Sequence, residues 1–260
     1  MKKKYILFFI VAFVATMAWN HITDRTYKPT AAAANETEDG HSVSPYIHFR
    51  ESMQRKINSI HGYVHPDRIP KSLKQAIVAV EDKRFYEHGA VDPFGIIRAA
   101  AVNVYSGETV EGGSTLSQQV IKNSFLSQER TLSRKGRELF LSILLERNYT
   151  KDEILAIYLN TAYFGANATG INQASRIYFG IDTESLTLAQ SAMLAGLVQA
   201  PTYYNPFENY SGAKARQKTV LEQMVSQDMI TRSQAETAYR ENIHLQKQGE
   251  YRNDQYRRYL

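Results

Sequence analysis

The sequence contains no cysteine, so it excludes disulfide bonds and thiolate chemistry, and the compartment must be inferred from other features. It also has no internal repeat and no block of alternating apolar and polar residues that would be typical of half-buried strands. With 43% hydrophobic and 11% aromatic residues, the chain still has enough apolar side chains for an ordinary core. These features predict a mainly α-helical globular part.

The chain has no strong excess of either charge, and its formal net charge over 260 residues is +5. A moderate positive balance suits an anionic partner, such as a phosphate, a nucleic acid or an acidic membrane surface. Because the basic residues gather in one block and no nucleic-acid-binding motif is present, we expect no nucleic-acid partner.

The N-terminal residues predict a membrane anchor. Three lysines at positions 2–4 precede residues 5–19, an apolar stretch that ends at Trp19. At about 1.5 Å per residue the stretch is somewhat short of a hydrocarbon core of about 30 Å, but flanking lysines can snorkel. Lysines favour the cytoplasmic side, so we predict a single-pass transmembrane signal anchor at residues 1–20, with the rest of the chain outside. The alternative is a cleaved signal peptide, although the small residues 31–34 lie far beyond the apolar stretch.

The remaining chain divides by composition into a tether, a folded domain and a tail. Residues 21–45 are polar and rich in small side chains, which predicts a flexible tether. Residues 46–245 form the expected domain, and residues 246–260 form a polar basic tail. After a helix that ends at Glu81, further helices are expected at 93–105, 116–123, 131–148, 151–158, 186–199, 213–229 and 231–243.

Glu81 lies on the apolar side of its predicted helix. Ile77, Glu81 and Phe85 recur at helical spacing and therefore share one face. A carboxylate on a buried face is unfavourable unless it is paired or functional. The alternative interpretation is a helix end with solvated charges, because Asp82 and several other charged residues follow at once.

A glycine-rich segment, residues 112–119, precedes another predicted helix. Gly112 and Gly113 allow the backbone to approach a ligand closely, and Ser114 or Thr115 can cap the helix. The amides of Gln118 and Gln119 suit a hydroxyl-rich substrate. By itself, however, this pattern is also typical of ordinary helix capping.

A run of cations and a second carboxylate follow the glycines. Five cations suit a diphosphate, although they would also fit a solvated basic face: Lys122, Arg130, Arg134, Lys135 and Arg137. Glu138 shares a helical face with Leu141 and Leu145. A surface ion pair with Arg134 would contribute only about 0.3–0.5 kcal/mol and would not explain those apolar neighbours. The same helix is expected to carry a core stripe of Leu139, Ile143 and Leu144.

Four motifs occur in an order that is typical of one enzyme family. They are Glu81-Asp82-x-x-Phe85-x-x-His88-x-x-x-Asp92, Gly112-Gly113-Ser114-Thr115-x-x-Gln118-Gln119, Arg134-Lys135-x-x-Glu138 and Lys151-x-Glu153-Ile154-Leu155-x-x-Tyr158-Leu159-Asn160. Over about residues 65–245, the sequence resembles the peptidoglycan glycosyltransferase (transglycosylase) domain, glycosyltransferase family 51, of class A penicillin-binding proteins and monofunctional transglycosylases.

The resemblance implies that residues 46–245 form a lysozyme-like, two-lobed helical domain with a cleft between the lobes. It also implies glycan-strand polymerisation from lipid II. The growing chain, carried on undecaprenyl diphosphate, would be transferred to the 4-hydroxyl of an acceptor lipid II with inversion and release of undecaprenyl diphosphate. Glu81 would be the general base for that hydroxyl, and Glu138 would be the second catalytic carboxylate.

The resemblance further implies how the leaving diphosphate is held. The expected diphosphate ligands are Lys122, Arg130, Arg134 and Lys135. Glu138 would either orient these cations or reach the diphosphate through Mg²⁺ or Mn²⁺, and the sequence leaves both options open. The other expected cleft residues are Arg84, Arg98, Ser114 and Gln118, for each of which a structural role is the alternative.

The helix at residues 93–105 is the expected membrane-facing element, because its broad apolar face could enter the outer leaflet. The alternative is a core helix. The expected partners are lipid II, the lipid-linked glycan, the bacterial cytoplasmic membrane and transpeptidases of the cell-wall machinery. The alternative functions are a lysozyme-like glycan hydrolase or lytic transglycosylase, and a non-catalytic membrane-anchored scaffold. A hydrolase would not require the cation run, since glycan cleavage involves no diphosphate.

Overall fold

The computed structural model describes residues 45–106, 113–126 and 131–247. The predicted anchor, nearly all of the tether, Gly112, Arg130 and most of the tail lie outside these ranges. Within them the regular structure is helical, and the single β-bridge joins Tyr163 to Thr169. The prediction of a mainly α-helical domain is therefore confirmed.

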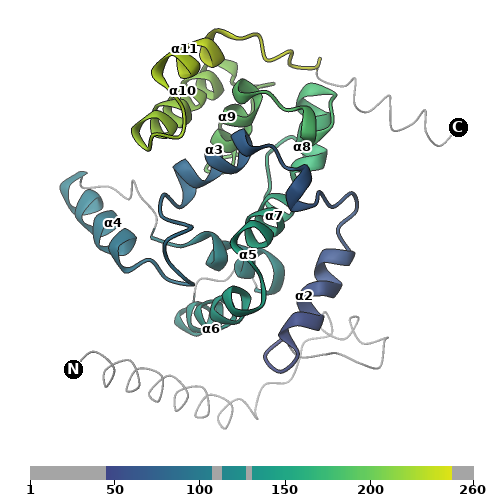
Figure 1. Cartoon of the computed structure of the whole chain (residues 1–260), viewed down its shortest axis with the longest axis vertical. Helices are drawn as coiled ribbons and strands as arrows, with labels where there is room; N and C mark the ends of the chain where they lie inside the picture. The colour runs from purple at the N-terminus through teal and green to yellow at the C-terminus, as the bar shows by residue number, and fades with distance from the viewer. Residues whose placement is uncertain (1–44, 107–112, 127–130, 248–260) are drawn as a thin grey trace, which may run out of the picture. The chain divides into compact units, whose positions relative to one another are not determined.

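Ten α-helices span the described residues, and Figure 1 shows their order along the chain. They are α2 (Phe49–Asn58), α3 (Lys71–Glu81), α4 (Pro93–Ser106), α5 (Leu116–Phe125), α6 (Leu132–Asn148), α7 (Lys151–Thr161), α8 (Ile171–Phe179), α9 (Leu188–Leu197), α10 (Tyr210–Ser226) and α11 (Arg232–Arg240). Two short 3₁₀ turns, η3 (Pro66–Arg68) and η4 (Thr183–Ser185), join them. Among the described helices, none is both long and apolar enough to cross a bilayer.

Threonine begins five of the described helices. In each case its hydroxyl accepts a hydrogen bond from the amide three residues later, at Thr115, Thr131, Thr150, Thr187 and Thr231. Such a cap stabilises a helix by about 1 kcal/mol, because it satisfies an amide that has no partner within the helix. The starts of these five helices are therefore encoded locally, and their predicted ranges agree closely with the observed ones. Helices α2 and α8, which have no side-chain cap, were not predicted.

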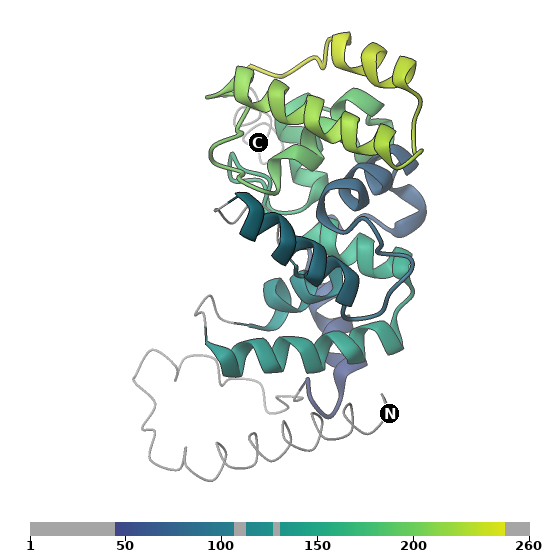
Figure 2. The same cartoon turned by 90° about the vertical axis from the view of Figure 1, so that its left-hand side faces the viewer.

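The helices pack in two groups. In one group α9 packs against α3 and α10, and α10 also contacts α3 and α11. In the other, α5 packs against α6 and α7, while α2 contacts α6. Figures 1 and 2 show α7 passing from the second group toward α8 and the first. The candidate residues come from both groups, since Glu81 ends α3 and Glu138 lies on α6.

Helix α4 differs from the others because large apolar side chains on it are exposed. Phe94 and Ile97 are each 67% exposed, Ile96 is 45% exposed and Tyr105 is 96% exposed. The alternative of a core helix is therefore wrong for the described side chains of α4. Its one buried apolar side chain among them is Ala99.

The core stripe predicted on α6 is wrong for Leu139 and Ile143, whereas Leu144 is partly buried and packs against the core. Leu139 and Ile143 are 37% and 39% exposed, whereas Leu141 and Leu145 are fully buried. Apolar residues occupy more than one face of this helix, so periodicity could not decide which face is buried. Packing against α5 selects the face that carries Leu141, Leu145 and Glu138.

Candidate active site

Glu81 is the last residue of α3 and is partly exposed. Its Oε2 atom accepts a hydrogen bond of 3.0 Å from Nε2 of Gln119 on α5. Burial raises the pKa of the Glu81 carboxyl above its ordinary value, and the negative charge of Asp82 raises it further. The hydrogen bond from Gln119 and the positive charge of Arg216 act in the opposite direction and lower this pKa. A carboxylate with a raised pKa is a better general base than an exposed one.

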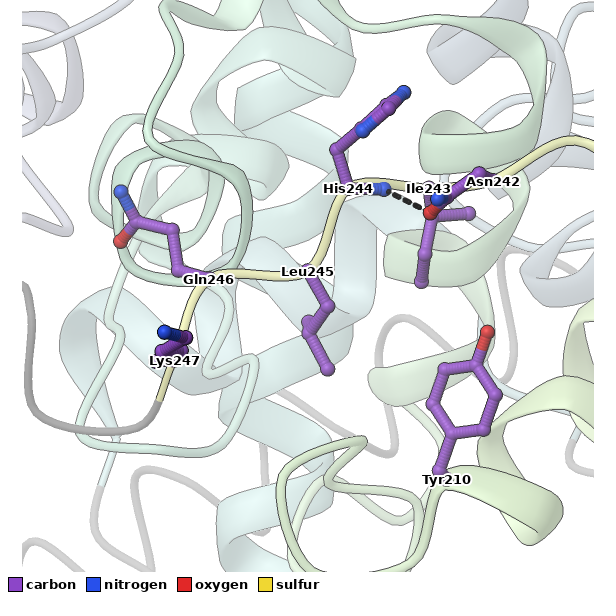
Figure 3. Close-up of a pocket in the computed structure, with 7 residues that line it drawn as sticks. All are labelled: Tyr210, Asn242, Ile243, His244, Leu245, Gln246 and Lys247. Atoms are coloured by element: carbon purple, nitrogen blue, oxygen red, sulfur yellow. Dashed lines mark hydrogen bonds between the residues drawn. The ribbon is translucent and has the colours of Figure 1, made fainter.

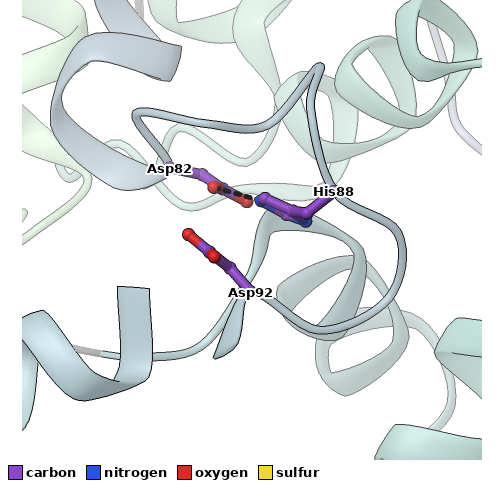
Figure 4. A group of neighbouring side chains, drawn as sticks. All are labelled: Asp82, His88 and Asp92. Carbon is purple, nitrogen blue, oxygen red and sulfur yellow. Dashed lines mark hydrogen bonds and ion pairs between the residues drawn. The ribbon is translucent and has the colours of Figure 1, made fainter. Parts of the chain in front are cut away.

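The loop that follows Glu81 is fastened to the start of α5. Figure 4 shows the Asp82 side chain beside His88, with 2.7 Å between Asp82 Oδ1 and His88 Nε2. The other oxygen, Asp82 Oδ2, accepts a bond of 3.0 Å from the backbone amide of Leu116. Asp82 therefore holds the end of α3, its loop and the first turn of α5 in one arrangement.

Arg84 and Asp92 fasten the far end of the same loop. Asp92 Oδ1 accepts a bond from the Phe94 amide at 3.1 Å and lies 3.4 Å from Nη1 of Arg84. The guanidinium of Arg84 also lies 4.7 Å from the centre of the Phe94 ring and donates to Glu87 at 3.0 Å. Arg84 is thus engaged at the start of α4, in agreement with the structural alternative for this residue.

Glu138 is the centre of a second, cationic cluster. Its side chain is 3% exposed, and its two oxygens pair with Nη1 of Arg134, at 3.2 Å, and with Nζ of Lys135. The Lys135 ammonium also donates to Ser114 Oγ at 3.1 Å and to Gln118 Oε1 at 3.2 Å. Because Lys135 remains 46% exposed, this cluster presents an oriented cation to solvent.

The cluster of Asp82, His88 and Asp92 and the side chain of Glu138 are the two places where a metal ion could be considered, and both are poorly suited to bind one. Donor atoms of Asp82, His88 and Asp92 lie within 4.8 Å of one another, but each is engaged in the contacts described above and Arg84 places a cation beside Asp92. At Glu138, both oxygens already face cations, which would repel a divalent ion. The chain's own residues therefore favour the interpretation that Glu138 orients cations, and an accompanying Mg²⁺ or Mn²⁺ stays a prediction.

The first turn of α5 links the two carboxylates. Gln119 holds Glu81, and its neighbour Gln118 holds Lys135 and donates to the carbonyl of Ala90 at 3.1 Å. Thr115, which caps α5, donates to the same carbonyl at 3.0 Å. The glycine-rich motif therefore serves both as a helix start and as the bridge between the two centres.

The structure brings together only part of the predicted site. Ser114, Gln118, Arg134, Lys135 and Glu138 form the cationic cluster, and Glu81 joins it through α5. The roles of the other predicted ligands stay predictions: Lys122 is exposed on α5, Arg98 is exposed on α4 and Arg130 lies outside the described residues.

Two residues that act on Glu81 were not among the predicted catalytic or binding residues. Gln119 was expected, with Gln118, to offer its amide to a hydroxyl-rich substrate, and not to hold Glu81. Arg216 had no signal, because it lies on α10, far from Glu81 in sequence, in a segment whose pattern indicates only an ordinary helix. Its charge acts on the Glu81 pKa, and α10, which carries it, packs against α3.

A separate hollow of about 560 Å³ is lined by Tyr210 and residues 242–247. Figure 3 shows the side chains of His244, Gln246 and Lys247 pointing in different directions, while the His244 amide donates to Asn242 Oδ1 at 2.9 Å. Its polar groups do not converge on one point, so this hollow is a weaker candidate than the site at Glu81 and Glu138.

Comparison with known proteins agrees with this geometry. The transglycosylase family model matches residues 50–225. The chain belongs to the transglycosylase family. It is 40% identical over 221 residues to penicillin-binding protein 1A of Neisseria gonorrhoeae, covering 85% of this chain and 26% of that protein.

Other transglycosylase-family relatives are similarly close. Identity is 50% over 173 residues with penicillin-binding protein 1A/1B of Bacillus subtilis, covering 66% of this chain and 19% of that protein. The chain is 46% identical over 177 residues to penicillin-binding protein 1A of Escherichia coli, and the match covers 68% of this chain and 21% of that protein. The chain thus spans 19–26% of the length of these relatives. The resemblance to the transglycosylase domain of class A penicillin-binding proteins is confirmed.

Proposed function

We propose that this transglycosylase-family chain polymerises peptidoglycan glycan strands from lipid II. The growing chain on undecaprenyl diphosphate is transferred to the 4-hydroxyl of an acceptor lipid II, with inversion and release of undecaprenyl diphosphate. One observation carries the proposal: the first turn of α5 joins a partly exposed carboxylate, Glu81, to an oriented cation, Lys135. These are the base and the leaving-group stabiliser that this transfer requires.

Glu81 is suited to be the base. Gln119 holds Oε2, while Oε1 accepts no hydrogen bond from the described residues, so that oxygen is available to the acceptor hydroxyl. As the hydroxyl oxygen attacks the anomeric carbon, its proton passes to Glu81 and the bond to the diphosphate oxygen breaks. A positioned base contributes about 10²–10⁴-fold to such a step.

The cationic cluster is suited to the leaving diphosphate. The electron pair of the broken bond leaves on the diphosphate oxygen, and Lys135 and Arg134 stabilise that charge. Glu138 holds both cations in place before the substrate arrives, so little reorganisation is needed. A glycan hydrolase has no comparable use for this cluster, since its reaction produces no diphosphate.

The proposal includes a membrane location. We place residues 1–20 as a single-pass anchor, with the N-terminus inside and a lysozyme-like, two-lobed domain on the outer face of the bacterial cytoplasmic membrane. The exposed side chains of Phe94, Ile96 and Ile97 support contact between α4 and the outer leaflet. There the domain would meet its lipid substrate and the transpeptidases that cross-link its product.

The test is to incubate the purified chain in liposomes with labelled lipid II, with and without divalent ions, and to separate the products on a gel. A ladder that disappears after muramidase treatment supports the proposal. Absence of polymer under both conditions would favour the scaffold, and shortening of preformed glycan would favour the hydrolase. The Glu81→Gln variant serves as the inactive control.

A further inference from the structure

Glu146 stands out because one of its oxygens receives hydrogen bonds from two other helices. It lies near the end of α6, and its side chain is 14% exposed. Its Oε1 atom accepts a bond from Nζ of Lys151, at 2.8 Å, and another from Oγ of Ser117. Lys151 begins α7, and Ser117 lies in the first turn of α5. A single carboxylate oxygen therefore joins α5, α6 and α7, which pack against one another (Figure 1).

Through Lys151, Glu146 is connected to the loop that follows Glu81. The Lys151 ammonium lies 4.4 Å from the centre of the Phe85 ring, and this ring is fully buried. Such a cation–π contact is stronger where water is excluded. The Phe85 amide donates to the carbonyl of Asp82 at 2.9 Å, and Asp82 directly follows Glu81. Lys151 therefore holds, through Phe85, the turn at which the helix of Glu81 ends.

Through Ser117, Glu146 is connected to the hydrogen-bond partner of Glu81. Ser117 is fully buried and lies two residues before Gln119 on α5. Its carbonyl also accepts a bond of 3.4 Å from Oγ of Ser142 on α6, so both its side chain and its main chain are fastened. Gln119 in turn donates to Glu81 at 3.0 Å. The bond between Gln119 and Glu81 thus closes a ring of contacts that passes through Glu146.

The ion pair of Glu146 and Lys151 has a consequence beyond stability. A buried ion pair is by itself weak evidence for stability, because desolvation of the two charges offsets their attraction. The loop after Glu81 and the first turn of α5 are already fastened to each other once, where Asp82 accepts a bond from the Leu116 amide at 3.0 Å. One fastening lets two elements pivot about it, whereas a second one, through Glu146, fixes their relative orientation.

We propose that Glu146 is a positioning residue for the transfer reaction: through Ser117 and Lys151 it fixes the orientation in which Gln119 holds Glu81. A reacting group must be held within about 0.5 Å of its productive position, and the residues behind it determine whether it is. Glu146 itself touches neither the substrate nor the reacting atoms. This inference rests on the proposed function, in which Glu81 is the base.

The first test is the pH dependence of kcat/KM for lipid II in Ser117→Ala, which breaks one connection without changing any charge. The Gln119 hydrogen bond lowers the pKa of Glu81, so a looser bond should move the acidic limb of the profile to higher pH. A shift of about half a pH unit is expected, which is a roughly threefold loss of kcat/KM below the midpoint. Ser117→Thr, which keeps the hydroxyl, should retain the wild-type limb.

Two charge-changing variants separate positioning from a direct charge effect. Glu146→Gln removes a negative charge and Lys151→Met removes a positive one, so a direct effect on Glu81 would move the acidic limb in opposite directions. Positioning predicts that both variants move it to higher pH. If either variant does not fold, Ser117→Ala still decides the question.

A double-mutant cycle and a matched control complete the activity test. In a Gln119→Leu background, Ser117→Ala should move the acidic limb no further, since the bond it loosens is already gone. Glu153→Ala removes the capping box at the start of α7 and should lower the melting temperature without moving the limb. A Ser117→Ala profile that falls equally at all pH values, or an equal shift in the Gln119→Leu background, would overturn the proposal.

A second readout does not depend on activity. The folded-state pKa of Glu81 is raised, so the stability that this group contributes is full below its ordinary pKa of 4.5 and is lost as pH rises through the folded value. Ser117→Ala should raise that folded pKa, so its melting temperature should keep falling to higher pH than that of the wild type. The pH-dependent part of this difference should vanish when both chains carry Glu81→Gln.

The two readouts separate this inference from the proposed function. If the wild type makes no polymer, the proposed function fails, and the melting temperatures alone decide whether the Ser117 connection acts on Glu81. If the pH-dependent difference persists in the Glu81→Gln background, the connection acts on another group and the inference is overturned.

Discussion

Two glutamates of one domain occupy opposite environments. Glu138 is almost fully buried, and both of its oxygens pair directly with cations, whereas Glu81 is partly exposed and receives one hydrogen bond from a neutral amide. Direct pairing occupies the Glu138 oxygens and makes that carboxylate an anchor for Arg134 and Lys135. Partial burial with a single neutral hydrogen-bond donor leaves Glu81 able to accept a proton. The same side chain thus suits two roles, and the surrounding residues decide which.

The largest expected effect comes from removing the proposed base, Glu81. Glu81→Gln should lower polymerisation by about 10²–10⁴-fold, because the amide cannot accept the hydroxyl proton. The measurement is the initial rate of lipid II turnover, with circular dichroism to check the fold. Glu222→Gln, which changes an exposed carboxylate on α10, is the control and should be fully active. Activity near wild type in Glu81→Gln would exclude Glu81 as the base.

Removing the exposed cation should have the next largest effect. Lys135→Ala should reduce kcat/KM by about 10²–10³-fold, the loss typical of a removed transition-state donor, with a smaller effect on stability because the ammonium is 46% exposed. Arg147→Ala, on the same helix and also exposed, is the control. A large fall in melting temperature with unchanged specific activity would instead make Lys135 structural.

The two glutamates should also differ in their effect on stability. Glu138→Gln should destabilise the fold by about 1.5–3 kcal/mol, because it weakens charged hydrogen bonds at a buried site. Glu81→Gln should raise the free energy of unfolding at pH 8, since it removes a carboxylate whose charge is disfavoured by burial. That gain should disappear as pH falls below 4.5, where the folded and unfolded carboxyl groups both become protonated. Equal changes in the free energy of unfolding for the two substitutions at pH 8 would contradict the proposed difference between the two glutamates.

The smallest expected effect separates two neighbouring glutamines. Gln119→Leu removes a hydrogen bond that lowers the pKa of Glu81, so the acidic limb of the pH–rate profile should move to higher pH. Gln118→Leu removes a Lys135 contact and should reduce the rate about equally at all pH values. Measuring kcat/KM from pH 5 to 8 for both variants tests this difference. Identical pH profiles would show that Gln118 and Gln119 do not act separately on Lys135 and on Glu81.

The sequence predicted the two carboxylates because each breaks a local rule. Glu81 and Glu138 are charged residues at helical positions shared with apolar ones, and the structure buries Glu138 and partly buries Glu81. The same type of pattern failed for Leu139 and Ile143, since α6 has apolar residues on more than one face. Periodicity identifies an apolar face, but only a neighbouring helix can bury it.

The sequence by itself determined the family of the chain and most of its helices, though not α2 or α8, because these depend on motifs in a fixed order or on residues that are close together. Only the tertiary structure decided that Glu138 is neutralised by direct pairing and that Glu81 receives a single hydrogen bond from Gln119. The physical reason is that burial and charge act through space. Helices distant in the chain set the environment of a carboxylate, and no local pattern records which helices will meet.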